Sequence, residues 1–233
     1  MSLALLGLLP GSRALQCSLA RAQARQTWKR RFISTVNVSR PPASAPRESP
    51  TPLAFVSASQ WDPTSQEGLK QLAERLATKG FVCVHCDIDL GKPHEVRGVP
   101  QSSESLMKHF ESEFVSCLSQ SPSPFPPVIF ARGPGSLIAQ TFISSHRAGG
   151  MFLISPPPSN ADVPKHLLPT PLPEFDFEMK FPIALMGTAE EIEKLQQHRD
   201  LTKTGYVDTY VVDAIDKDTV LLKAEEWLDE LNI

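Results

Sequence analysis

Short apolar runs alternate along this 233-residue chain with segments in which apolar residues recur every three or four positions. Short runs bounded by turn residues are typical of buried strands, and the wider spacing is typical of helices that bury one face. The runs predict six strands, over residues 53–56, 81–88, 128–131, 151–154, 183–186 and 206–212. The wider spacing predicts five helices, with apolar faces over residues 69–76, 106–118 and 137–142, from residue 189 onward, and over residues 220–231.

Strands that alternate with helices favour parallel βαβ units, because a crossover helix returns the chain to the same end of the sheet. The sequence therefore predicts an α/β fold, a three-layer sandwich with a mostly parallel sheet of about six strands. Residues 35–52 are rich in Ser and Pro and are expected to form a linker. Residues 156–180 contain seven prolines and no periodicity, so we expect an insertion within the domain.

The first 47 residues differ from the rest in composition. They contain eight Arg and Lys residues, several Ser and no Asp or Glu, which is typical of a mitochondrial transit peptide. The apolar run at residues 3–9 is short and no basic residue precedes it, which disfavours a secretory signal. Residues 30–35, Arg-Arg-Phe-Ile-Ser-Thr, resemble the mitochondrial processing pattern, so we expect cleavage between Arg31 and Ser39.

This composition divides the chain into two parts. Residues 1–47 are expected to be a transit peptide and disordered linker, and residues 48–233 a single domain in the mitochondrial matrix. The alternative for the first part is a basic tail that binds anionic surfaces. After residue 47 the chain holds 15 basic and 26 acidic residues, a net charge of −11, which disfavours nucleic-acid binding. No apolar run reaches 18 residues, so no membrane span is expected.

Two patterns associated with metals and cofactors are present only in part. Cys83 and Cys86 form a C-x-x-C motif, but strand alternation would place them on opposite faces of the sheet. The six His residues show no metal-ligand spacing such as H-x-x-x-H. Residues 132–136, Arg-Gly-Pro-Gly-Ser, do not match G-x-G-x-x-G and follow the third strand rather than the first. We therefore expect neither a metal site nor a cofactor.

The segment from Pro127 to Gln140 carries the strongest chemical signal in the chain. An apolar run turns on glycines and enters a helix, which is the layout of a nucleophile elbow, the turn that presents the Ser of G-x-S-x-G. The corresponding five residues, 131–135, read Ala-Arg-Gly-Pro-Gly, so the position of the Ser is held by Gly133. Glycine tolerates the strained backbone of such a turn, but it has no side chain that can attack a carbonyl.

The order of the predicted elements, together with residues 80–87, the elbow and residues 151–156, resembles the α/β-hydrolase fold over residues 52–233. The insertion at 156–180 lies where these proteins usually carry a lid. The antiparallel hairpin that begins the full fold is not predicted by the pattern. Flavodoxin-like and Rossmann sheets share the alternation of strands and helices and stay open as alternatives.

The resemblance implies a Ser, an acid and a His in that chain order, in which His accepts the proton of Ser and the acid orients His. The nucleophile position is Gly133 and the acid position is Glu190, which is also suited to a helix N-terminus. The His position falls in residues 213–216 and is represented by Asp216, and no His follows His198. The resemblance therefore implies a degenerate active site.

Other residues near the elbow are the remaining candidates. Ser136, three residues past the elbow, is a weak candidate nucleophile, although Ser is common where helices begin. The amides of Gly133 and Gly135 at the start of a helix, together with Ser57 and Ser136, form the predicted ligand-binding set for an anion.

Three functions are compatible with these observations. The first is a non-catalytic binding or assembly module with a mitochondrial protein partner, which the empty nucleophile and His positions favour. The second is an esterase or thioesterase with relocated catalytic residues. The third is a flavodoxin-like domain that binds an anion or a nucleotide. Fold resemblance alone does not decide among them.

Overall fold

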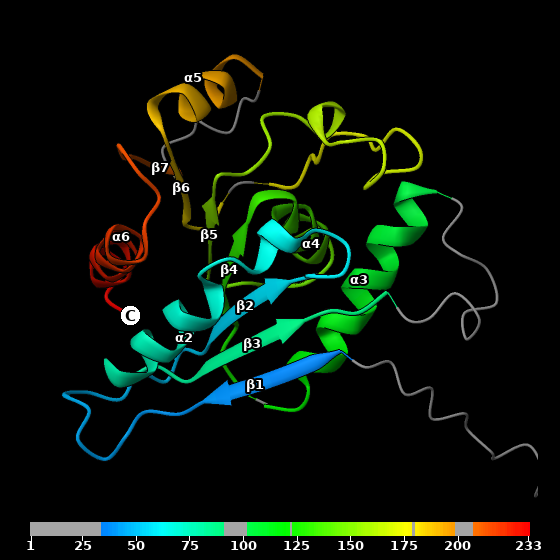
Figure 1. Ribbon diagram of the computed structural model, residues 1–233. Coiled ribbons are helices and arrows are strands. Elements are labelled where there is room, and N and C mark those ends of the chain that lie inside the picture. The colour runs from blue at the N-terminus through cyan, green and yellow to red at the C-terminus, as the bar shows by residue number, and fades with distance from the viewer. Residues whose placement is uncertain (1–33, 91–101, 122, 179, 199–206) are drawn as a thin grey trace, which may run out of the picture. The chain divides into compact units, whose positions relative to one another are not determined.

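The computed structural model describes residues 34–90, 102–121, 123–178, 180–198 and 207–233. It contains a seven-stranded sheet in the order β1-β3-β2-β4-β5-β6-β7, in which β1 is antiparallel to β3 and all other neighbours are parallel (Figure 1). The strands are β1 (Thr35–Ser39), β2 (Leu53–Ser57), β3 (Cys83–Asp87), β4 (Val128–Arg132), β5 (Gly150–Ile154), β6 (Ile183–Gly187) and β7 (Val207–Val211). The helices are α2 (Leu69–Thr78), α3 (Ser103–Leu118), α4 (Ser136–Ile143), α5 (Ala189–His198) and α6 (Lys217–Glu230).

Helices cover both faces of the sheet, so the predicted three-layer α/β fold is confirmed (Figure 1). Alternate residues of each strand point to opposite faces and form two separate cores. Phe55, Phe130 and Phe152 stack in a row across β2, β4 and β5, and they pack beneath α2 and α6. The other face packs against α3, α4 and α5. The mostly apolar central strands are buried on both sides, as parallel sheets require.

The first strand corrects the expected domain boundary. Residues 35–39 fall within the linker that the composition predicts, but β1 pairs with β3 along its whole length, so the folded unit begins before residue 48. The signal is weak because β1 is an edge strand that is mostly exposed, with Val36 and Val38 as its only apolar residues. The Ser and Pro residues that follow make the whole segment resemble a linker, so the short alternation of apolar and polar residues in β1 is not recognised as a strand. The sequence pattern predicts no antiparallel hairpin, and the structure has a single antiparallel strand, β1, at the edge of the sheet.

The proline-rich insertion at 156–180 has little regular structure, apart from a short 3-10 turn at Asn160–Asp162, but it is anchored to the domain. Trp61 Nε1 donates to the carbonyl oxygen of Leu167 at 2.9 Å, and Leu167 itself is buried. The amide of Ser103 at the start of α3 donates to Thr170 Oγ1 at 2.9 Å. The insertion is therefore held against both the loop after β2 and the beginning of α3.

No helix within the described ranges has the length and apolar character needed to cross a membrane. The same residues contain no cluster of three or more His, Cys, Asp or Glu side chains that could hold a metal ion.

Candidate functional site

The elbow is a sharp turn between β4 and α4, as the sequence indicated. Gly133 follows the last residue of β4 and has a φ of +53°, a left-handed backbone that favours glycine. Residues Gly133–Gly135 form a single 3-10 turn, and α4 begins at Ser136. The structure therefore has the strand–turn–helix of an elbow, with a glycine where the nucleophile would stand.

The space in front of Gly133 is occupied by another part of the chain. A Cβ atom added at Gly133 would lie 3.3 Å from Thr64 Oγ1 and 3.8 Å from Asp62 Oδ2. Both residues belong to the start of the 3-10 turn Pro63–Gln66, and Thr64 Oγ1 donates to Asp62 Oδ2 at 2.7 Å. The polar groups that a side chain at the elbow would meet are thus a hydroxyl and a carboxylate already bonded to each other.

The residue that follows Gly133 cannot supply an oxyanion-hole N–H. In α/β-hydrolases one oxyanion-hole donor is the backbone N–H of the residue that follows the nucleophile. That residue here is Pro134, which has no N–H to donate. Pro134 can be read from the sequence, but a search that considers only the side chains of the triad does not reveal the loss of this N–H.

Gly135 has a packing role. A Cβ atom at this position would lie 3.1 Å from Ser65 Cβ and 3.6 Å from the carbonyl oxygen of Val56, so the turn approaches β2 closely. Ser65 Oγ in turn accepts a 3.0 Å hydrogen bond from the amide of Ala58. The glycine thus allows the elbow to pack on the loop after β2.

The acid position, Glu190, lies in the first turn of α5. Glu190 is exposed and pairs with Lys194 at 2.7 Å, and this hydrogen bond and charge lower the pKa of Glu190. The inward-facing carboxylate is Glu191, whose Oε2 accepts from the amide of Thr188 at 2.8 Å. Thr188 Oγ1 lies 3.4 Å from the amide of Glu191, so the two residues form a capping box at the start of α5.

The His position is occupied by a helix cap. Asp216 Oδ1 accepts from the amides of Asp218 and Thr219 at 2.9 and 3.0 Å, and Oδ2 accepts from Thr219 Oγ1 at 2.6 Å. The hydrogen bonds from Thr219 lower the pKa of Asp216. This is the arrangement expected of an Asp that begins a helix, here α6.

Ser57 lies near a His and an Asp but does not form a triad with them. Its hydroxyl donates to Asp87 Oδ1 at 2.8 Å, so it can only accept from His85 Nε2, which lies 3.2 Å away. Burial lowers the pKa of His85, whose Nδ1 has no partner among the described residues. With the hydroxyl hydrogen directed to Asp87, Ser57 lies between the His and the Asp, whereas in a triad the His lies between the Ser and the acid.

Asp87 is the centre of this polar cluster. Besides Ser57, it accepts from the amide and the hydroxyl of Ser59, at 2.8 and 2.5 Å, and from Gln66 Nε2 at 3.4 Å. These bonds tie the end of β3 to the loop that follows β2. In α/β-hydrolases a second oxyanion-hole donor comes from the loop before the first crossover helix. The corresponding loop here follows β2 and is held by these hydrogen bonds to Asp87.

Ser136 is fully buried, and its Oγ has no hydrogen-bond partner among the described residues. An activated nucleophile is hydrogen-bonded to its base, and the Ser136 hydroxyl makes no such bond to a described residue. Three pockets of the domain, of about 580, 440 and 240 Å³, are lined by none of Ser57, Gly133, Gly135 and Ser136. The assignment of these four residues to a ligand site stays a prediction.

The C-x-x-C residues face different cores, as strand alternation indicated. Cys83 belongs to the core under α2 and α6, and Cys86 to the core under α3 and α4. Burial raises the pKa of the Cys83 thiol. A hydrogen bond with Cys117 and burial raise the pKa of Cys86. Both thiols are therefore protonated, and they do not form a paired redox site.

Among the comparisons with known proteins, only the comparison with solved structures gives matches, and these concern the fold. No protein-family model matches the sequence, and no curated protein sequence matches it. Among solved structures, the chain is similar to a putative alpha/beta hydrolase of unknown function from Agrobacterium tumefaciens, with 15% identity and a TM-score of 0.55 over 85% of this chain and 92% of that one.

Two further solved structures are similar at the same level. A dienelactone hydrolase from Anabaena variabilis has 13% identity and a TM-score of 0.56, over 84% of this chain and 91% of that one. A thermophilic esterase from Thermogutta terrifontis has 14% identity and a TM-score of 0.55, over 84% of this chain and 87% of that one. Together with the sheet order, these likenesses show that the chain has an α/β-hydrolase-type fold.

Proposed function

We propose that this chain is a non-catalytic member of the α/β-hydrolase fold that acts as a binding or assembly module, with a mitochondrial protein as its partner. The observation that carries the proposal is the pair Gly133-Pro134 at the elbow, which provides neither an attacking atom nor an oxyanion-hole N–H. The acid and His positions support it, because Glu190 is an exposed residue that pairs with Lys194, and Asp216 caps α6. Losing the nucleophile or the base alone removes several orders of magnitude of rate in such enzymes.

A fluorophosphonate probe tests this proposal directly, because it labels activated Ser hydroxyls. We expect no labelling of the purified protein, and no turnover of p-nitrophenyl esters or acyl-CoA thioesters across a range of chain lengths. We also expect Gly133→Ser to stay unlabelled, because the new hydroxyl would face the hydrogen bond between Thr64 and Asp62, and Pro134 supplies no oxyanion-hole N–H. A serine esterase treated in parallel provides the positive control.

Labelling of the wild-type protein at any Ser would overturn the proposal. If the label and the ester turnover disappeared in Ser136→Ala, the protein would be an ester or thioester hydrolase with relocated residues. A pull-down from a mitochondrial matrix extract addresses the assembly role. Migration of the protein in a complex of defined size supports that role, and migration as a lone chain contradicts it.

We propose a mitochondrial location from the Arg-rich, acid-free first 47 residues, and β1 narrows the expected processing site. Cleavage within residues 35–39 would remove part of a strand that pairs with β3 over five residues. We therefore expect the mature chain to begin at or before Ser34, as measured by N-terminal sequencing after import into isolated mitochondria. A mature form that begins at residue 40 or later, or a lack of import, would contradict this.

A further inference from the structure

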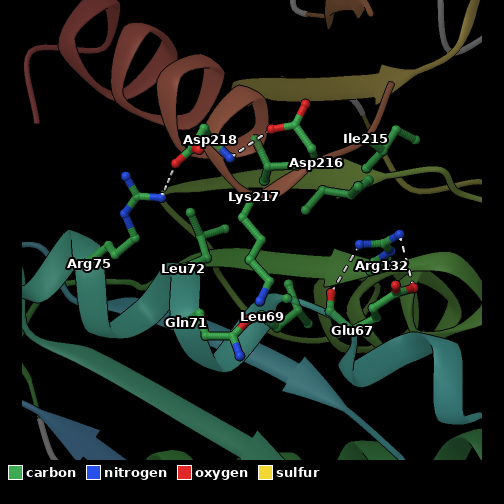
Figure 2. Close-up of a pocket in the computed structure, with 13 residues that line it drawn as sticks. Glu67, Leu69, Gln71, Leu72, Arg75, Arg132, Ile215, Asp216, Lys217 and Asp218 are labelled. Carbon is green, nitrogen blue, oxygen red and sulfur yellow. Dashed lines mark hydrogen bonds and ion pairs between the residues drawn. The ribbon is translucent and has the colours of Figure 1, made fainter. Parts of the chain in front are cut away.

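A pocket of about 440 Å³ lies between the N-terminal parts of α2 and α6, beside the elbow (Figure 2). Arg132 at the end of β4 and Ile154 at the end of β5 close it on the side of the sheet. The volume falls within the range of small-molecule sites. At about 30 Å³ for each water-sized group, it holds on the order of ten to fifteen non-hydrogen atoms.

The walls of this pocket are apolar and come from three elements. Leu69 and Leu72 extend from α2, Ile154 from β5 and Val220 from α6, and all four are buried. Ile215, in the loop before α6, is half-buried and also lines the pocket. The walls therefore suit a compact apolar group.

Most of the charges at the rim are already compensated. The Arg132 guanidinium is held by Glu67, with 3.1 Å to the carboxylate and 3.1 Å to the main-chain oxygen. Arg75 pairs with Asp218 at 2.6 Å. The carboxylate of Asp216 is occupied by the amides and hydroxyl at the start of its own helix.

Lys217 is the exception. Its ammonium has no hydrogen bond or ion pair to any described residue, and its side chain extends from α6 across the pocket toward Gln71 (Figure 2). On the described helices, Lys108, Lys194 and Lys223 each pair with a carboxylate three or four residues away, whereas Lys70 on α2, like Lys217, has no such pair to a described residue. Lys217 is also the first residue of α6, where the helix dipole disfavours a cation.

We propose that this pocket binds a small amphipathic anion, with a carboxylate or phosphate head at Lys217 and an apolar body among Leu69, Leu72 and Val220. An anionic head supplies the counter-charge that Lys217 lacks in the described structure. The apolar body packs against these walls and is itself removed from water. The inference does not depend on the elbow, because neither Gly133 nor Ser136 lines the pocket.

Equilibrium dialysis of the full chain with octanoate and with octyl phosphate tests the proposal. We expect saturable binding of one molecule per chain for at least one of them, and the better of the two identifies the head group. Lys217→Gln should weaken that binding about tenfold, because a hydrogen bond to a charged group is lost. Octanol should bind the wild-type protein about as weakly as the anion binds Lys217→Gln.

Lys223→Gln is the matched control, because Lys223 lies on the same helix, pairs with Glu226 and does not line the pocket. It should bind the anion as the wild-type protein does. Ile215→Ser should weaken octanol and the anion alike. The proposal is overturned if neither anion binds saturably, if octanol binds as tightly as the anion, or if Lys223→Gln loses as much affinity as Lys217→Gln.

This experiment is separate from the test of the proposed function. Dialysis measures binding beside Lys217, whereas the fluorophosphonate probe reports on Ser hydroxyls. A catalytic result at the elbow would leave the pocket proposal standing. A failure of both anions to bind would contradict the pocket proposal without affecting the proposal that the protein is non-catalytic.

Discussion

Trp227→Ala is expected to lower the free energy of unfolding by about 3–5 kcal/mol, the range for removing a large aromatic side chain from a core. Trp227 is fully buried on α6, and its ring packs edge-on against Phe152 at 5.5 Å between centroids. Its Nε1 also donates to Asp208 Oδ2 at 3.0 Å, which ties α6 to β7. Removing the ring leaves a cavity between this helix and the sheet.

Urea unfolding followed by far-ultraviolet circular dichroism measures this loss without relying on tryptophan fluorescence. Leu222→Ala is the control, since Leu222 lies on the same helix with 61% of its surface exposed, and it should change stability by less than about 0.5 kcal/mol. Equal effects of the two substitutions would show that α6 does not pack on the sheet through Trp227. If Trp227→Ala is too unstable to purify, Trp227→Phe should show a smaller loss in the same direction.

Gly80→Ala is expected to destabilise the protein by roughly 2–5 kcal/mol, because backbone strain and overpacking act at one atom. Gly80 follows α2 with a φ of +113°, and the amides of Gly80 and Phe81 bond back to Ala77 and Leu76 as in a Schellman motif. A Cβ atom would lie 2.0 Å from the main-chain oxygen of Arg47. The segment between β1 and β2 would have to move away.

Gly68→Ala separates the two causes. Gly68 also has a positive φ, of +76°, but a Cβ there would meet only Arg132 at 3.7 Å. We expect a loss of about 1–2 kcal/mol from the backbone alone, measured by the same urea titration. A loss at Gly80 no larger than that at Gly68 would mean that the segment around Arg47 is not packed against the end of α2.

The elbow illustrates how far local sequence signals reach. A strand, two glycines and an apolar helix are adjacent in the chain, so the turn at Gly133 could be predicted without tertiary information. The residues that surround this turn could not be predicted in the same way. Asp62 and Thr64 lie in the 3-10 turn that follows β2, far from Gly133 in the sequence, and they fill the space in front of Gly133 because the two 3-10 turns pack together. That Pro134 has no N–H is known from the sequence. Its consequence for the oxyanion hole follows once the turn places Pro134 directly after the nucleophile position.

The acid position shows a different limit of sequence reasoning. Glu190 and Glu191 both begin α5, and only the rotation of that helix decides which carboxylate turns inward. The capping box places Glu191 inward and leaves Glu190 with Lys194. The pattern Thr188-x-x-Glu191 is readable as a cap from the sequence, since that spacing is the signature of the motif.

The α/β class, the central strands and the lack of an attacking side chain at Gly133 could all be predicted from the amino-acid sequence, because they depend on periodicity and residue identity over a few neighbouring positions. The pairing of residues 35–39 with the sheet, and the pocket to which α2 and α6 bring Lys217 and Leu72, depend on long-range packing. These features join segments far apart in the chain. Their contacts depend on strand order and helix packing, which no short sequence window encodes.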